Sequence, residues 1–196
     1  MLKIVLIRPG STDFDEQGRI KGCLDVPLNE HGTAQVAQTI SELSDIKIDL
    51  VYTSPCEACR QTAEALRRER DIKVRELDSL RNIDQGLWHG RLIEDVKRTQ
   101  PRVYRQFQFH PETICPPNGE PLQAARQRVA SVIIKLRRKH RRGVIALVVP
   151  EPLASMFRSS LKHVELGDLW KVQCQCGGWE QYPVGALNPT AVPDQV

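Results

Sequence analysis

Short apolar segments that alternate with helical patterns are the feature that most constrains how this chain folds. The segments expected to be strands are residues 2–7, 49–53, 72–75 and 144–149. The helix expected at 121–140 carries apolar side chains at spacings of three and four. Strands that are apolar on both faces must be covered on both faces, which favours a mostly parallel sheet. The sequence therefore predicts a three-layer α/β/α fold.

The length of the chain fits one domain of this kind. Its 196 residues can bury a sizeable core, and no linker or internal repeat divides them. We expect a single α/β domain over residues 1–184, with a helix around 91–108 and a hairpin at about 170–182. Residues 185–196 contain two prolines and are expected to form a loose C-terminal tail.

Charge and hydropathy favour a cytoplasmic protein with no strong nucleic-acid signal. No segment approaches the roughly 20 apolar residues that cross a membrane, and the N-terminal apolar segment is too short for the core of a signal peptide. The net charge of +4 comes largely from the basic run at 137–142. No aromatic residues interleave this run, so we interpret it as a solvated helix end and not as a surface for nucleic acid or lipid.

Six cysteines raise the question of a metal or redox site. Cys56 and Cys59 are spaced as C-x-x-C and begin a predicted helix, whose N-terminus stabilises a thiolate. A zinc site that adds Cys174 and Cys176 is disfavoured, because a C-x-C spacing suits zinc poorly. No thioredoxin-like pattern surrounds the first pair. We therefore expect reduced core cysteines, with neither a metal nor another cofactor.

The ends of the predicted strands carry several sequence blocks. The blocks are residues 6–12 (LIRPGST), 18–32, 52–55, 61–64, 86–90 (GLWHG), 119–120 and 148–152 (VVPEP). In this order they resemble the signature blocks of the histidine phosphatase superfamily, the phosphoglycerate mutase-like proteins. The resemblance implies a phosphoglycerate mutase-like fold with its site where strands end and helices begin.

The resemblance also implies catalytic groups that this sequence does not supply. In the superfamily a first His carries the phosphoryl group, and a second His and two Arg bind its oxygens. The first His aligns with Pro9, whose side chain is no nucleophile. The second His aligns with Glu151, which reverses the charge, and the second Arg aligns with Ala58. Among these positions, only Arg8 matches the residue type that the superfamily pattern requires.

Two further positions depart from the family pattern. The acid that protonates the leaving oxygen aligns with Asn82, and a loop Asn that helps to hold phosphate aligns with Asp15. A carboxylate near a buried Arg usually pairs with it, so Arg8 is expected to pair with Glu151 or with Asp15. We predict a degenerate pocket, without catalytic or metal-ligating residues, formed by Arg8, Pro9, Gly10, Ser11, Asp15, Lys21, Ala58, Asn82 and Glu151.

These substitutions favour a pseudophosphatase. The chain is then predicted not to be an enzyme but a binding, scaffold or regulatory protein, with an unknown protein or small molecule as its partner. Whether it forms a homodimer is left open. One alternative is a hydrolase or metal-binding enzyme that reuses the pocket through Asp15 and Glu151. Another is a weak residual phosphatase whose nucleophile is a metal-activated water.

Overall fold

A five-stranded sheet forms the centre of the structure, a computed structural model that describes residues 1–113 and 115–184. The strands are β1 (Leu2–Ile7), β2 (Leu50–Thr53), β3 (Val74–Glu76), β4 (Gly143–Val148) and β5 (Trp179–Val184). They lie in the order β3-β2-β4-β1-β5. The first four strands in this order are parallel, and β5 pairs antiparallel with β1 at one edge.

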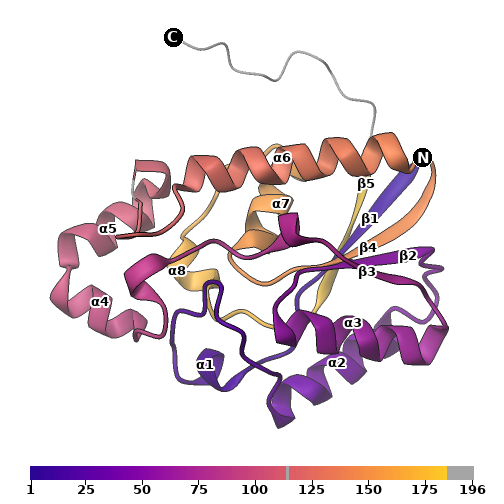
Figure 1. The fold of residues 1–196 in the computed structure, drawn as a ribbon, viewed down its shortest axis with the longest axis horizontal. Coiled ribbons are helices and arrows are strands. Elements are labelled where there is room, and N and C mark those ends of the chain that lie inside the picture. Colours follow the sequence, from indigo (N-terminus) through magenta and orange to yellow (C-terminus); the bar gives the residue numbers. More distant parts are fainter. Residues whose placement is uncertain (114, 185–196) are drawn as a thin grey trace.

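Helices cover both faces of this sheet (Figure 1). They are α2 (Glu30–Glu42) and α3 (Glu57–Arg70) on one face, and α6 (Leu122–Lys139) and α7 (Leu153–Lys162) on the other. Side chains of β1 alternate between the two cores, because Ile4 packs into the core cluster that includes α6 and α7, whereas Val5 packs into the one that includes α3. The predicted three-layer α/β/α fold with a mostly parallel sheet is confirmed.

The helix predicted around 91–108 is two helices. They are α4 (Ile93–Thr99) and α5 (Pro101–Phe109), separated by Gln100. Proline restricts the residue before it to an extended or turn conformation, and Gln100 has φ −132° and ψ 55°. The chain therefore turns at Gln100, and Pro101 begins α5, where its missing N–H group costs nothing.

The hairpin predicted at about 170–182 is wrong. The chain forms a short helix, α8 (Leu169–Val172), and then enters β5. Trp170 is buried, and its ring stacks on Tyr104 with the ring centroids 5.0 Å apart. Burial of this indole draws residues 169–172 against α5 and away from a strand. The second strand of the expected hairpin pairs with β1 instead.

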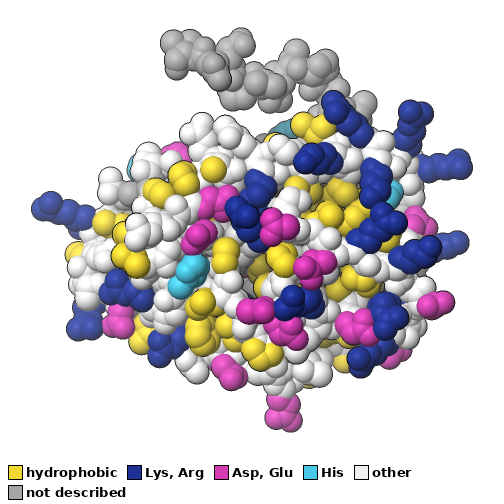
Figure 2. All heavy atoms as spheres, viewed as in Figure 1, with side chains coloured by type: hydrophobic (Ala, Val, Ile, Leu, Met, Phe, Trp, Pro, Cys, Tyr) yellow, Lys and Arg dark blue, Asp and Glu magenta, His cyan; other side chains and the backbone are white. Residues whose placement is uncertain are grey.

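Short helical turns complete the described residues. They are α1 (Asp13–Glu16) and three 3₁₀ turns, η1 (Asp78–Leu80), η2 (Gly86–Trp88) and η3 (Pro111–Thr113). The basic run begins in the last turn of α6, and Figure 2 shows Lys and Arg side chains gathering at that end of the molecule. No helix in the described part of the chain is long and apolar enough to cross a membrane. The predicted tail, residues 185–196, lies outside the described residues.

Candidate functional site

The carboxyl ends of the parallel strands bring two predicted site residues, Arg8 and Glu151, to one edge of the sheet together with Ser54, which was not predicted. Arg8 follows β1, Ser54 follows β2, and Glu151 lies three residues after β4. Backbone hydrogen bonds hold these strand ends together, because Ser54 N donates to Val148 O and Val149 N donates to Ile7 O. Binding sites in sheets of this type lie at this edge.

Arg8 is held by groups from the far end of the sequence. Its Nε donates to Gly177 O at 2.9 Å, and its Nη1 donates to Glu180 Oε1 at 3.4 Å. Glu151 Oε1 lies 3.9 Å from the same nitrogen. Of the two expected partners, Glu151 is therefore near Arg8, but Glu180 on β5 is nearer. Nothing in the sequence blocks pointed to Glu180, because it reaches Arg8 only through the pairing of β5 with β1.

Asp15, the other expected partner of Arg8, pairs with Lys21 instead. The Lys21 Nζ lies 2.5 Å from Asp15 Oδ1, and both residues are buried. The Asp15 carboxylate also accepts hydrogen bonds from the backbone and hydroxyl of Thr12. Burial is the largest single effect and lowers the pKa of Lys21, but the charge and hydrogen bond of Asp15 together with the nearby thiols of Cys176 and Cys59 outweigh it, so the net effect raises that pKa. The positive charge of Lys21 and the negative charge of Asp15 therefore neutralise each other.

Glu151 is buried at the end of β4 with incomplete hydrogen bonding. Its Oε2 accepts a bond from Ser155 N at 3.0 Å, whereas Oε1 has no hydrogen-bond partner among the described residues. Burial raises the pKa of Glu151, despite the Ser155 hydrogen bond and the charge of Arg8. Glu151 therefore holds its proton more tightly than an ordinary glutamic acid does.

The remaining predicted residues have structural contacts. Pro9 O accepts a hydrogen bond from Gly177 N. Gly10 packs directly on the backbone of Gly32, where a Cβ would lie 2.1 Å from Gly32 O. Ser11 N donates to Gln35 Oε1 in α2, and Ala58 is buried in α3. Gly10 and Ser11 thus serve the contact with α2 and not the strand-end group around Arg8.

A cavity of about 280 Å³ lies next to Asn82 and Ser54. It is lined by Cys23, Asp25, Ser54, Pro55, Cys56, Asp78, Arg81 and Asn82. Only Asn82 among them belongs to the predicted pocket. Its Nδ2 donates to the backbone oxygens of Gly22 and Glu151, at 3.0 Å each. The Oδ1 of Asn82 and the Oγ of Ser54 are buried and accept no hydrogen bond from a described residue.

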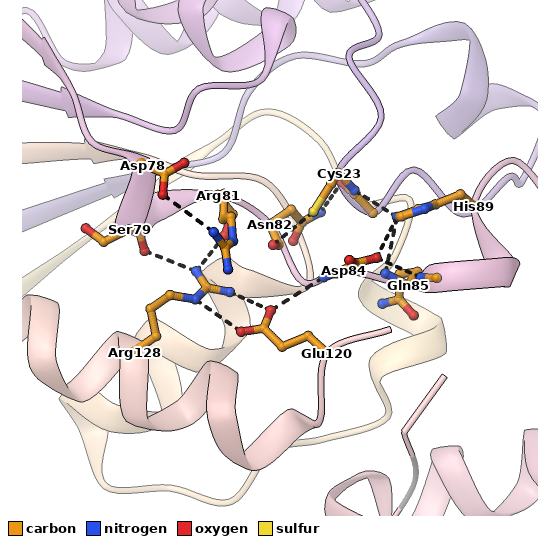
Figure 3. Close-up of polar contacts among 12 residues, drawn as sticks. Cys23, Asp78, Ser79, Arg81, Asn82, Asp84, Gln85, His89, Glu120 and Arg128 are labelled. Atoms are coloured by element: carbon orange, nitrogen blue, oxygen red, sulfur yellow. Dashed lines mark hydrogen bonds and ion pairs between the residues drawn. The ribbon is translucent and has the colours of Figure 1, made fainter. Parts of the chain in front are cut away.

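A polar network fixes the loops that carry Cys23, Arg81 and Asn82 (Figure 3). Arg128 of α6 pairs with Glu120 at 2.8 Å, and its Nη1 donates to the backbone oxygens of Ser79 and Arg81. His89 Nε2 accepts hydrogen bonds from the backbone of Cys23 and of Gln85. His89 is thus a loop contact, and Figure 3 shows it next to Cys23, at the opposite side of the network from Arg128.

Metal chemistry through Asp15 and Glu151 finds no support in this geometry. Asp15 pairs with Lys21, and Oε2 of Glu151 accepts a hydrogen bond from Ser155 N. Within residues 1–113 and 115–184, no group of three or more His, Cys, Asp or Glu side chains could hold a metal ion.

The strand-end blocks also match a known family. A sequence model described as the histidine phosphatase superfamily (branch 1) matches residues 4–183. The chain belongs to the histidine phosphatase superfamily. Phosphoserine phosphatase 1 of Hydrogenobacter thermophilus is 29% identical over 89% of this chain and 82% of its own length. Adenosylcobalamin/alpha-ribazole phosphatase of Escherichia coli is 25% identical over 91% and 88% of the two chains.

Solved structures of this superfamily share the fold. A putative alpha-ribazole-5'-P phosphatase from Escherichia coli superposes with a TM-score of 0.78 at 24% identity, covering 92% of this chain and 89% of its own. A phosphoserine phosphatase mutant of Entamoeba histolytica, in complex with phosphoserine, gives a TM-score of 0.79 at 21% identity, with 92% and 90% covered. The phosphoglycerate mutase-like architecture inferred from the sequence blocks is thereby confirmed.

The comparisons contradict the prediction that this superfamily member is not an enzyme. Its relatives are named as phosphatases, so enzymatic activity is the expectation for a chain of this similarity. The prediction went too far because it treated the loss of one mechanism as the loss of all catalysis. What Pro9 excludes is a phosphohistidine at residue 9, since its side chain has no nucleophilic atom.

Proposed function

We propose that this superfamily member binds a small organic molecule with amine or hydroxyl groups in the cavity beside Asn82, and does not bind a phosphate dianion at Arg8. The observation that carries the proposal is the pair of buried oxygens, Ser54 Oγ and Asn82 Oδ1, that accept no hydrogen bond from a described residue. A buried acceptor without a donor costs free energy, and a ligand that supplies the donor recovers it.

The cavity also suits such a ligand in size and charge. At about 280 Å³ it is below the usual range of about 300–1,000 Å³ for sites that hold drug-sized molecules. Asp25 and Asp78 place two carboxylates at its wall. Arg81 is there as well, but it lies 3.5 Å from Asp78. Acceptors and carboxylates therefore outnumber the cationic groups that a phosphate needs.

Phosphate binding at Arg8 is disfavoured by the carboxylates around it. Glu180 and Glu151 lie 3.4 Å and 3.9 Å from Arg8 Nη1. A pair of unit charges at such a distance interacts by about 4 kcal/mol at an effective dielectric constant of 20. A dianion would have to displace Glu180 and tolerate Glu151. This supports a ligand of another class, even though the relatives are named as phosphatases.

We place this binding role in the cytoplasm, which keeps cysteines reduced, and all six cysteines of the chain carry free thiols. Because the relatives are enzymes, the bound molecule is also the candidate substrate. Any turnover must begin from a group other than residue 9.

Binding and turnover can be tested together on the full chain. Ethanolamine serves as the donor-bearing probe, inorganic phosphate as the dianion, and p-nitrophenyl phosphate as the reporter of hydrolysis. We expect ethanolamine, and not phosphate, to shift the NMR amide signals of Ser54 and Asn82. The S54A variant should lose this shift, because it removes one acceptor. The S44A variant, which changes an exposed serine, is the matched control and should keep it.

Phosphate binding is the result that would overturn the proposal. If phosphate shifts these signals, or if p-nitrophenyl phosphate is hydrolysed by the wild type and not by the R8A variant, the site is a residual phosphatase site. Equal ethanolamine shifts in the wild type and S54A would also reject the proposed cavity.

A further inference from the structure

The first turn of α3 places two thiols at different depths beside the cavity. Cys56 is the N-cap residue of this 14-residue helix and lines the cavity wall. Cys59, one helical turn later, is fully buried in the core between α3 and the sheet. Residues three apart on a helix are neighbours, so the two thiols lie close together at the start of α3. One thiol thus meets the cavity while the other lies directly behind it.

The surroundings of the two thiols give them different pKa values. The neighbouring thiol and backbone N–H of Cys59, with Ser54 and the charge of Lys21, lower the pKa of Cys56 to about 7, although burial opposes them. Burial, followed by the contact with Cys56, raises the pKa of Cys59 well above its ordinary value. Cys56 is therefore the nucleophilic thiolate and Cys59 the protonated thiol.

A third thiol in the same cavity can be compared with that of Cys56. Cys23 lines the same wall as Cys56. Burial and the charge of Asp84 raise the pKa of Cys23 to about 11. Access to the cavity therefore does not by itself make a thiol reactive here, and the neighbouring Cys59 at the start of α3 distinguishes Cys56 from Cys23.

We propose that Cys56 and Cys59 form a redox-active pair, which is oxidised to an intramolecular disulfide by a low-molecular-weight disulfide whose S–S bond reaches Cys56 at the cavity wall. The partner is of the glutathione class, a small disulfide whose sulfurs can reach Cys56. This assignment is independent of the ligand proposed above. It replaces the expectation from sequence that both cysteines serve only core packing.

The reaction balances without a further reagent. The Cys56 thiolate attacks one sulfur of the small disulfide, whose S–S bond breaks and releases one thiolate. The Cys59 sulfur then attacks the Cys56 sulfur of the mixed disulfide, and the second small thiolate leaves. The proton of Cys59 passes to one departing thiolate, and the proton that Cys56 released on ionisation returns from the solvent to the other. Two protein thiols are oxidised, and one small disulfide is reduced to two thiols.

The test treats the reduced full chain with oxidised glutathione near neutral pH, followed by acid quenching, alkylation and peptide mass spectrometry. In the wild type we expect a Cys56–Cys59 disulfide. In C59A, which lacks the resolving thiol, we expect a stable glutathione adduct on Cys56. In C56S, Cys59 should carry no adduct, and C23S should behave as the wild type. Circular dichroism checks that each variant is folded.

A second measurement needs no variant. The rate of iodoacetamide alkylation of Cys56 in the wild type should rise with an apparent pKa of about 7, whereas that of Cys23 should still be rising at high pH. Near neutral pH, Cys56 should react roughly tenfold or more faster, after allowing for the lower intrinsic nucleophilicity of the more acidic thiol. Equal rates, or glutathione on Cys23 and none on Cys56, would overturn the proposal. So would a Cys56 adduct that persists in the wild type without closing onto Cys59.

Discussion

The side-chain amide of Asn82 donates a hydrogen bond of 3.0 Å to the backbone oxygen of Glu151. This bond joins the loop after β3 to the end of β4, and a second bond from the same nitrogen reaches Gly22 O. Asn82 stands where the superfamily resemblance implies an acid. Its two donated bonds show that an amide at this position has a structural use that a carboxylate could not fulfil.

Restoring an acid at this position should therefore destabilise the protein. The N82D variant replaces a donor by a buried carboxylate that faces two backbone oxygens. We expect the free energy of unfolding to fall by about 3 kcal/mol at neutral pH, because both oxygens lose their donor. Urea unfolding measures the change. N118D, at an exposed asparagine, is the control and should stay within about 0.5 kcal/mol. An unchanged N82D midpoint would contradict the assigned bonds.

Removal of Lys21 should be costly for a different reason. In K21M the carboxylate of Asp15 remains buried without its cation. We expect a loss of about 3 kcal/mol or more in urea unfolding, since breaking one half of a buried pair leaves an uncompensated charge. The D15N/K21M double variant should recover part of that loss.

An exposed lysine provides the matched control for that experiment. Lys97 lies 3.4 Å from Glu94 on the surface. K97M should change the free energy of unfolding by at most about 1 kcal/mol, because exposed pairs contribute little. If K21M and K97M were equally mild, Lys21 and Asp15 would not form a buried pair in solution.

The buried carboxyl of Glu151 should make stability fall as pH rises. Its pKa is raised above the ordinary value of 4.5, so the folded state binds the proton more tightly than the unfolded state. Stability from this group is present below the ordinary pKa and is lost as pH rises through the raised one. E151Q should therefore match the wild type in acid and exceed it at neutral pH. E94Q, at an exposed glutamate, should show no such gap in melting temperature.

The guanidinium of Arg128 should not be replaceable by an ammonium group. It binds both oxygens of Glu120 and the backbone oxygens of Ser79 and Arg81. Lysine keeps the charge but cannot make this planar set of bonds. R128K should lose about 2 kcal/mol in the free energy of unfolding, whereas R126K, at an exposed arginine of the same helix, should be nearly neutral. Full stability of R128K would show that only the charge matters here.

Much of the fold could be predicted because its signals are local. The apolar stretch at 2–7 and the helical spacing at 121–140 are confined to neighbouring residues, and both elements form within two residues of their predicted bounds. The hairpin at 170–182 failed because its competitor is not local. Trp170 is buried against Tyr104, a contact that spans 66 residues, and no strand forms at residues 169–172.

At the candidate site, likewise, the identities of the residues could be predicted from the sequence, whereas their contacts could not. The sequence by itself determined which side chains stand at the strand ends, and so that residue 9 has no imidazole to carry a phosphoryl group. Only the tertiary structure decided which partners neutralise their charges. Arg8 pairs with Glu180, which lies 172 residues away in the sequence, and Asp15 pairs with Lys21. The tertiary structure also decided that Cys56 lines the cavity while Cys59 is buried in the core. Identity is encoded residue by residue, whereas burial and charge pairing depend on which distant segments the sheet brings together.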